Sequence, residues 1–84
     1  VVVLAVPLTP QTERLIDALQ LAPGARVCDL GCGPGLVLEG LRARVGARGE
    51  VLGVDESPRW QDVVRARIAQ SGWGNVRFLR ARLE

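Results

Sequence analysis

The sequence predicts an α/β fold in which a parallel sheet of strand order 3-2-1 carries helices on its faces. Short apolar runs alternate with stretches of helical periodicity, which is the pattern of consecutive βαβ units. A glycine-rich loop follows the first run, and Asp-Glu-Ser-Pro follows the second, as expected where a strand gives way to a helix. Right-handed crossovers between the parallel strands then set the strand order.

The first predicted element is a helix over residues 10–20. Thr9 is a suitable N-cap, and Pro10 suits the first helical position. The following Pro23-Gly24 forces a turn, because neither residue continues a helix. Three residues are expected on the apolar face of this helix: Leu15, Ile16 and Leu19.

A buried strand over residues 26–30 comes next and ends at the glycine loop. A second helix is predicted over residues 35–45, with Gly46 at its C-cap. A second strand spans residues 50–54. The apolar side of the second helix is expected to hold four residues: Val37, Leu38, Leu41 and Val45.

The third helix is expected to be capped by Ser57, to have Pro58 at its first position and to end at Ser71-Gly72. A third strand follows over residues 75–79. The apolar stripe of this helix is expected to hold Trp60, Val63, Val64 and Ile68.

The glycine loop lies between a strand and a helix, the context in which a glycine pattern indicates a ligand site. Gly31 permits a sharp turn, and Gly33, without a Cβ, lets a ligand approach the backbone. Gly35 lets the next helix start close to the strand. The loop amides and the helix N-terminus are expected to supply donors and positive potential to a ligand.

Two carboxylates distinguish this loop from a site for a dinucleotide. A dinucleotide loop requires glycine at position 36, which is Leu36 here. Asp29, at the carboxyl end of its strand, would repel a diphosphate but suits an ammonium group. Asp55 ends the next strand, where a carboxylate accepts hydrogen bonds from both ribose hydroxyls. Three alternatives stay open: Asp29 stabilises the loop, Asp55 caps the third helix, and Glu56 is a solvated rim charge.

These residues resemble the motifs of class I S-adenosylmethionine-dependent methyltransferases. Residues 27–35, Val-Cys-Asp-Leu-Gly-Cys-Gly-Pro-Gly, resemble the first motif of that family, and residues 51–55, Val-Leu-Gly-Val-Asp, resemble the second. Residues 75–79 resemble its third strand. The resemblance covers roughly residues 12–84 and is nearest to small-molecule methyltransferases of the ubiquinone/menaquinone type. It implies a Rossmann-like sheet, S-adenosylmethionine as cofactor and a small-molecule methyl acceptor.

The resemblance also assigns roles to residues of the cofactor site. Asp29 would hold the methionine ammonium, and Asp55 the ribose hydroxyls. Glu56 would pack beside the adenine. Four loop residues complete this site, the first three passing their backbone along the methionine and ribose: Gly31, Cys32, Gly33 and Gly35.

The chain departs from the family at two points. Ala81-Arg82 stand where the family has an acidic pair that meets the adenine amine, and an arginine cannot accept from that amine. Family members also continue with further strands and helices that bind the acceptor. Residues 1–84 are therefore expected to be the N-terminal, cofactor-binding half of a methyltransferase domain, with the C-terminal half absent.

Composition excludes several other functions. The chain has 84 residues and a net charge of +2, and its eleven basic residues, all arginine, are scattered without a dense run. Nucleic acid is therefore not an expected partner. With no histidine and two cysteines, neither a metal site nor a disulfide framework is expected, and two free thiols suit the cytoplasm. The apolar start, Val1 to Val6, is too short to span a membrane.

No catalytic residue is predicted, because no base accompanies Cys32 to make it a nucleophile. The main hypothesis is a piece of a methyltransferase that acts on a small molecule. The alternative is a non-catalytic, truncated module that binds the cofactor weakly or pairs with another chain, and a nicotinamide-type dinucleotide domain is less favoured. The strand over residues 26–30 would lie unpaired at the sheet edge, so self-association through that edge is also expected.

Overall fold

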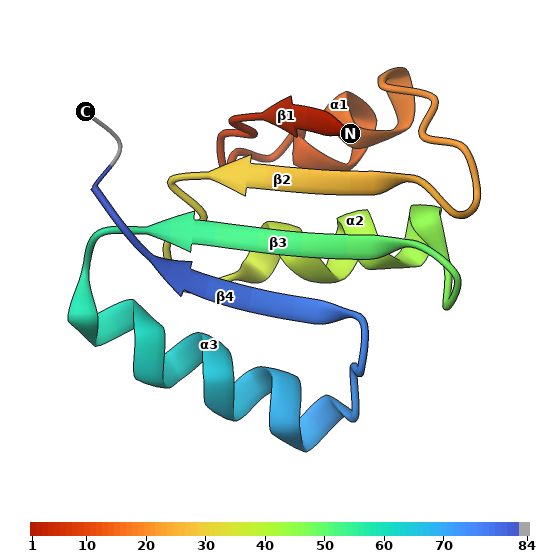
Figure 1. Cartoon of the computed structure of the whole chain (residues 1–84). Helices are drawn as coiled ribbons and strands as arrows, with labels where there is room; N and C mark the ends of the chain where they lie inside the picture. Colours follow the sequence, from red (N-terminus) through yellow and green to blue (C-terminus); the bar gives the residue numbers. More distant parts are fainter. Residues whose placement is uncertain (83–84) are drawn as a thin grey trace.

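The computed structural model describes residues 1–82 and shows one parallel sheet of order β1-β2-β3-β4 (Figure 1). The predicted α/β class is confirmed, and the three predicted strands lie in the predicted order. The observed strands are slightly shifted or extended relative to the predicted ranges. Their bounds are β1 (Val2–Leu4), β2 (Arg26–Leu30), β3 (Glu50–Asp55) and β4 (Val76–Arg80).

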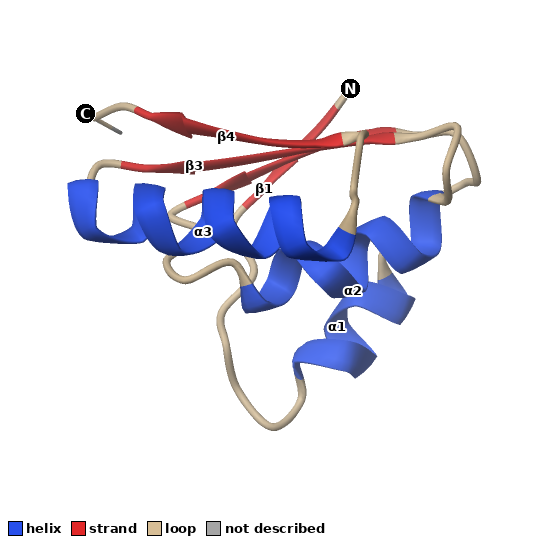
Figure 2. Ribbon diagram, turned by 90° about the horizontal axis from the view of Figure 1, so that it is seen from below, coloured by secondary structure: helices blue, strands red, loops and turns tan. Residues whose placement is uncertain are grey.

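The three described helices all cover the same face of the sheet (Figure 2). They are α1 (Thr12–Ala18), α2 (Leu36–Val45) and α3 (Pro58–Ser71). Each connects two neighbouring parallel strands, and every step runs in the same direction across the sheet. Right-handed crossovers that step in one direction put every helix on one side. The other face, which presents Cys28 and a 51% exposed Leu79, is left without a helix among residues 1–82.

The prediction that residues 26–30 form an unpaired edge strand is wrong. Val2, Val3 and Leu4 of β1 pair in parallel with Val27, Cys28 and Asp29 of β2. A run of β-branched valines suits an extended strand, and pairing satisfies the backbone groups that β2 would otherwise leave open. Self-association stays a prediction, but it loses the free edge on which it was based.

The hydrophobic core lies between the sheet and the helices. All four residues predicted on the apolar side of α2 are buried. Gly46 takes the C-cap with φ +72°, as predicted. In α3 the predicted N-cap is confirmed, but Val64 alone of the expected stripe is fully buried. The largest fully buried apolar side chains are Ile16, Leu38, Leu41, Val45, Val51 and Val64.

Helix α1 is shorter than predicted and starts differently. It begins at Thr12 rather than Pro10, and Thr9 is not its N-cap. The Thr12 hydroxyl instead accepts the Thr9 N–H at 2.7 Å, which closes the turn before the helix. Ile16 is buried as expected, whereas Leu15 is 42% exposed. Helix α2, against which α1 packs, covers a narrower stripe of this helix than its sequence periodicity indicates.

Asn75 holds the amino end of β4 against the turn between α2 and β3. Its Nδ2 donates to the carbonyl oxygens of Gly46 and Gly49, both at 2.9 Å. Its Oδ1 accepts from Arg42 Nε at 3.0 Å. One amide side chain thereby sets where β4 starts, and so where β4 ends beside β3.

Candidate functional site

The two predicted site carboxylates lie on the helix-covered face near the carboxyl edge of the sheet, because Asp29 pairs with Gly53, whose face is covered by Leu38 of α2. This edge is on the left side of Figure 1. Asp29 is paired in register with Gly53, and Asp55 lies two residues further along the same strand. With adjacent strands about 4.8 Å apart and about 3.3 Å per residue, the two Cα atoms are separated by about 8 Å. One ligand of nucleoside size can therefore reach both side chains.

Asp29 is buried, with 1% of its surface exposed. Its Oδ1 accepts the backbone N–H of Val6 at 3.2 Å. Its Oδ2 is buried without a hydrogen-bond partner among residues 1–82. Burial raises the pKa of Asp29, and the Val6 hydrogen bond opposes that shift only in part. The site therefore contains a buried carboxylate oxygen that lacks a donor, which an ammonium group would supply.

Asp55 bridges the glycine loop and the start of α3. Its Oδ2 accepts the Gly33 N–H at 2.9 Å, and its Oδ1 accepts the Ser57 N–H at 3.0 Å. Asp55 thus closes the turn that leads into α3, although it accepts no amide from the first turn of that helix. This role does not exclude a ligand, because each carboxylate oxygen has a further lone pair and the residue is only half-buried.

The amides of residues 31–35 are engaged within the protein in this structure, and their role as ligand donors stays a prediction. The N–H groups of Gly31 and Cys32 both donate to the Val54 carbonyl, at 2.7 and 3.0 Å, and that of Gly33 donates to Asp55. Gly35 N–H donates to the Cys32 carbonyl, and the intervening proline has no N–H. The loop amides are used by the neighbouring strand and by the loop itself, an arrangement unsuited to binding a diphosphate.

Two glycines of the loop have distinct structural roles. Gly33 has φ +55°, and nothing lies within 4 Å of the position a Cβ would take, so its surface is open to a ligand. Gly35, with φ +84°, is buried against α3, where an added Cβ would lie 3.0 Å from Val64 Cγ2. Close approach of the helices, rather than of helix and strand, accounts for glycine at this second position.

Cys32 lies in the loop between the two carboxylates and is 6% exposed. Burial raises the pKa of its thiol to about 12, and the negative charges of Asp29 and Asp55 add to the shift. A thiol with so high a pKa is not a nucleophile at neutral pH.

Beyond Asp55 the edge is hollowed at the position predicted for the adenine. The exposed Glu56 lies on its rim, at the turn between β3 and α3. Ser57, Arg80, Ala81 and Arg82 complete the lining. The structure thus brings every predicted site residue to one edge of the sheet.

Sequence reasoning missed Val6, whose backbone covers Asp29. It acts through its amide, so no side-chain pattern could have revealed it.

Within the described part of the chain, no cluster of three or more potential metal-ligating His, Cys, Asp or Glu side chains is present. None of the helices formed by residues 1–82 is long and apolar enough to span a membrane.

Comparisons with known proteins point to one family. Residues 27–84 match the family model described as a methyltransferase domain. The chain is 34% identical over 71 residues to aklanonic acid methyltransferase DauC of Streptomyces sp. (strain C5), and this match covers 84% of the chain and 32% of that relative. It is 37% identical over 67 residues to nocamycin O-methyltransferase of Saccharothrix syringae, covering 80% of the chain and 24% of that relative.

Solved structures agree with this result. A SAM-dependent methyltransferase from Aquifex aeolicus superposes with a TM-score of 0.77 at 25% identity, over 88% of this chain and 43% of the other. The chain thus spans 24% to 32% of the length of these two curated relatives and less than half of this structural neighbour.

Proposed function

The chain belongs to the methyltransferase domain family, and from this premise we propose that it forms the S-adenosylmethionine-binding part of an enzyme that methylates a small molecule. The main observation behind this proposal is that two carboxylates, Asp29 and Asp55, lie on the same face of the sheet near its carboxyl edge. S-adenosylmethionine presents an ammonium group and a ribose diol, which are the donors that two such carboxylates require.

The residues of the site fit this cofactor. The orphaned Oδ2 of Asp29 lacks the donor that an ammonium group provides. Only one hydrogen bond of 3.2 Å, from Val6, occupies the other oxygen, so a small shift of the N-terminal segment admits the amine. The open surface at Gly33 leaves room for the chain that joins amine and ribose.

The roles proposed for this chain are binding and orientation. Bound S-adenosylmethionine supplies a methyl group on a sulfonium, which is transferred by direct displacement. Asp29 holds the amine, Asp55 holds the ribose hydroxyls, and Glu56 borders the base. The backbone of Gly31, Cys32 and Gly33 lies along the ligand, and Gly35 brings α2 and α3 together behind it. We assign no catalytic base to these residues, and the acceptor is bound by groups outside this chain.

The proposed acceptor is a small molecule rather than a nucleic acid. Two relatives are named for aklanonic acid and nocamycin, and the arginines of this chain are scattered along the sequence. The two free thiols favour a reducing compartment, and we propose the cytoplasm.

Calorimetric titration with S-adenosylhomocysteine tests the proposal. The chain is expected to bind, and Asp55→Asn to weaken binding at least tenfold, because the charge-assisted hydrogen bonds to the ribose are lost. Asp62→Asn, at an exposed position of α3, is the matched control and should bind like the parent.

Because Asp55 also closes the turn before α3, a second arm leaves the protein unchanged and varies the ligand. The 2′-deoxyribose analogue of S-adenosylhomocysteine should bind the parent chain more weakly than the ribose form. If the folded parent chain releases no heat with S-adenosylhomocysteine, the proposal is refuted and the alternative hypothesis of a non-catalytic module remains. Equal affinity for both sugars would refute the role of Asp55.

A further inference from the structure

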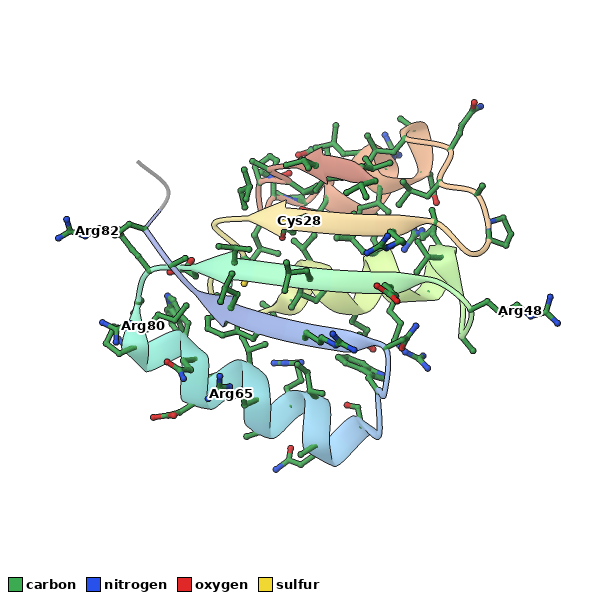
Figure 3. All side chains as sticks on the ribbon, viewed as in Figure 1. Cys28, Arg48, Arg65, Arg80 and Arg82 are labelled. Carbon is green, nitrogen blue, oxygen red and sulfur yellow. The ribbon has the colours of Figure 1, made fainter. Side chains whose placement is uncertain are left out.

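The hollow next to Asp55 has an arginine wall. It has a volume of about 550 Å³ and lies where β3 and β4 end. Arg80 and Arg82 contribute the cations, and Glu56 contributes the carboxylate in the lining. In Figure 3, Arg80 lies beside the start of α3, and Arg82 extends outward beyond the end of β4. The charge of this hollow is thus opposite to that of the Asp29 end of the site.

Arg80 is held in place by the turn that follows β3. Its Nε donates to the backbone carbonyl of Glu56 at 3.1 Å. Asp55 and Arg80 are register partners, so both side chains leave the sheet on the same face. The Ala81 N–H donates to the Asp55 carbonyl at 3.0 Å and carries the pairing one step beyond the strand. The Arg80 side chain therefore starts beside Asp55, and its guanidinium is anchored on the backbone that directly follows Asp55.

A guanidinium and a carboxylate recognise different parts of a purine base. A carboxylate accepts hydrogen bonds from the exocyclic amine of adenine, whereas a guanidinium only donates. The Nη groups of Arg80 have no hydrogen-bond partner among residues 1–82, so they remain able to donate to ring nitrogens. A planar guanidinium also stacks on the face of an aromatic ring.

On the premise of the proposed function, we infer that Arg80, clamped by the Glu56 carbonyl, is the residue that holds the purine base. A ribose held by Asp55 directs its base into the hollow, against the Arg80 guanidinium. Recognition by stacking does not require the adenine amine. The chain therefore binds a hypoxanthine cofactor analogue about as well as the adenine form, because both bases present the same planar face to the guanidinium.

Calorimetry with S-adenosylhomocysteine and S-inosylhomocysteine tests this inference. The parent chain should bind the two within about threefold of each other. Arg80→Ala should weaken both by about tenfold, since the stack on the base is lost. Arg80→Lys should lose nearly as much, because an ammonium keeps the charge but has no planar face. Arg65→Ala, at an exposed position of α3, is the control and should leave both affinities unchanged.

The outcomes separate the inference from its premise. The inference would be overturned if S-adenosylhomocysteine binds tightly and the hypoxanthine analogue binds more than twentyfold more weakly. That result would mean that an acceptor such as the Glu56 carboxylate accepts a hydrogen bond from the adenine amine. Unchanged binding by Arg80→Ala, with urea unfolding like that of the parent, would overturn it as well. A folded parent chain that binds neither ligand overturns the proposed function and this inference together.

Discussion

Asp29→Asn is expected to stabilise the ligand-free chain and to weaken its binding of S-adenosylhomocysteine. Asparagine has the shape of aspartate and keeps an oxygen for the Val6 N–H, but it removes a buried charge whose Oδ2 has no partner among residues 1–82. A buried polar group without a partner costs about 1–3 kcal/mol, and a charged one costs more, so the neutral amide removes the excess although it stays unpaired. The free energy of unfolding at pH 7 should rise by about 1 kcal/mol, and each 1 kcal/mol raises the Tm of so small a domain by about 4–8 °C.

The gain must depend on pH in a defined direction. Burial raises the pKa of Asp29 above its unfolded value, so the folded state favours the protonated side chain. The contribution of Asp29 to stability is therefore complete below the unfolded pKa, about 3.9, and is lost as the pH rises through the folded pKa. The advantage of asparagine should be largest near neutral pH and should shrink as the pH falls toward 4.

Urea unfolding at pH 7 and pH 4.5, followed by tryptophan fluorescence, measures both effects. Asp62→Asn is the control, because this exposed residue of α3 should show no such gain. A loss of stability in Asp29→Asn at pH 7, or a gain that is the same at both pH values, would refute the reasoning. In calorimetry the same variant should bind S-adenosylhomocysteine at least tenfold more weakly. Unchanged affinity would refute the proposal that Asp29 binds the amine of the ligand.

Gly35→Ala should lower the free energy of unfolding by about 2–4 kcal/mol, because φ +84° strains alanine and its Cβ meets Val64; urea unfolding measures this, and a loss below 1 kcal/mol would contradict it. Asn75→Asp should cost a similar amount, about 2–4 kcal/mol, since two carbonyls lose their donors and face a carboxylate; unchanged unfolding would show that this amide does not hold β4. In a Cys28→Ser background, the Cys32 thiol, with a pKa of about 12, should react with a disulfide reagent at pH 8 only at the rate of unfolding. Fast labelling of the folded chain would show that the thiol is accessible.

Much of the fold follows from local sequence. The glycine loop, the Ser57-Pro58 helix start and the apolar periodicity of α2 each correspond to the observed element. Such signals are carried by a few adjacent residues and depend little on distant partners. Two predictions were wrong because they depend on distant contacts: that residues 26–30 form an unpaired edge strand, and that α1 starts at Pro10. Pairing by β1, and the Thr12 side chain that closes the turn, are decided by contacts beyond local propensity.

The candidate site divides in the same way. Placing Asp29 and Asp55 at one edge needs only the rule that parallel strands end together, so the sequence was sufficient. The use of the loop amides was not predictable, because it depends on where the Val54 carbonyl of the neighbouring strand lies. The clamp on Arg80 likewise depends on the carbonyl of a turn that precedes it by a whole helix.

The sequence by itself determined the order of strands and helices, the residues of the carboxyl edge and the family resemblance, because spacing and residue type encode them. The tertiary structure decided which of those groups are still available to a ligand. It left one oxygen of Asp29 without a donor, directed the loop amides into β3 and anchored Arg80 on the Glu56 carbonyl. Hydrogen-bond capacity is shared among groups far apart in the chain, and only their positions in space show which group has used it.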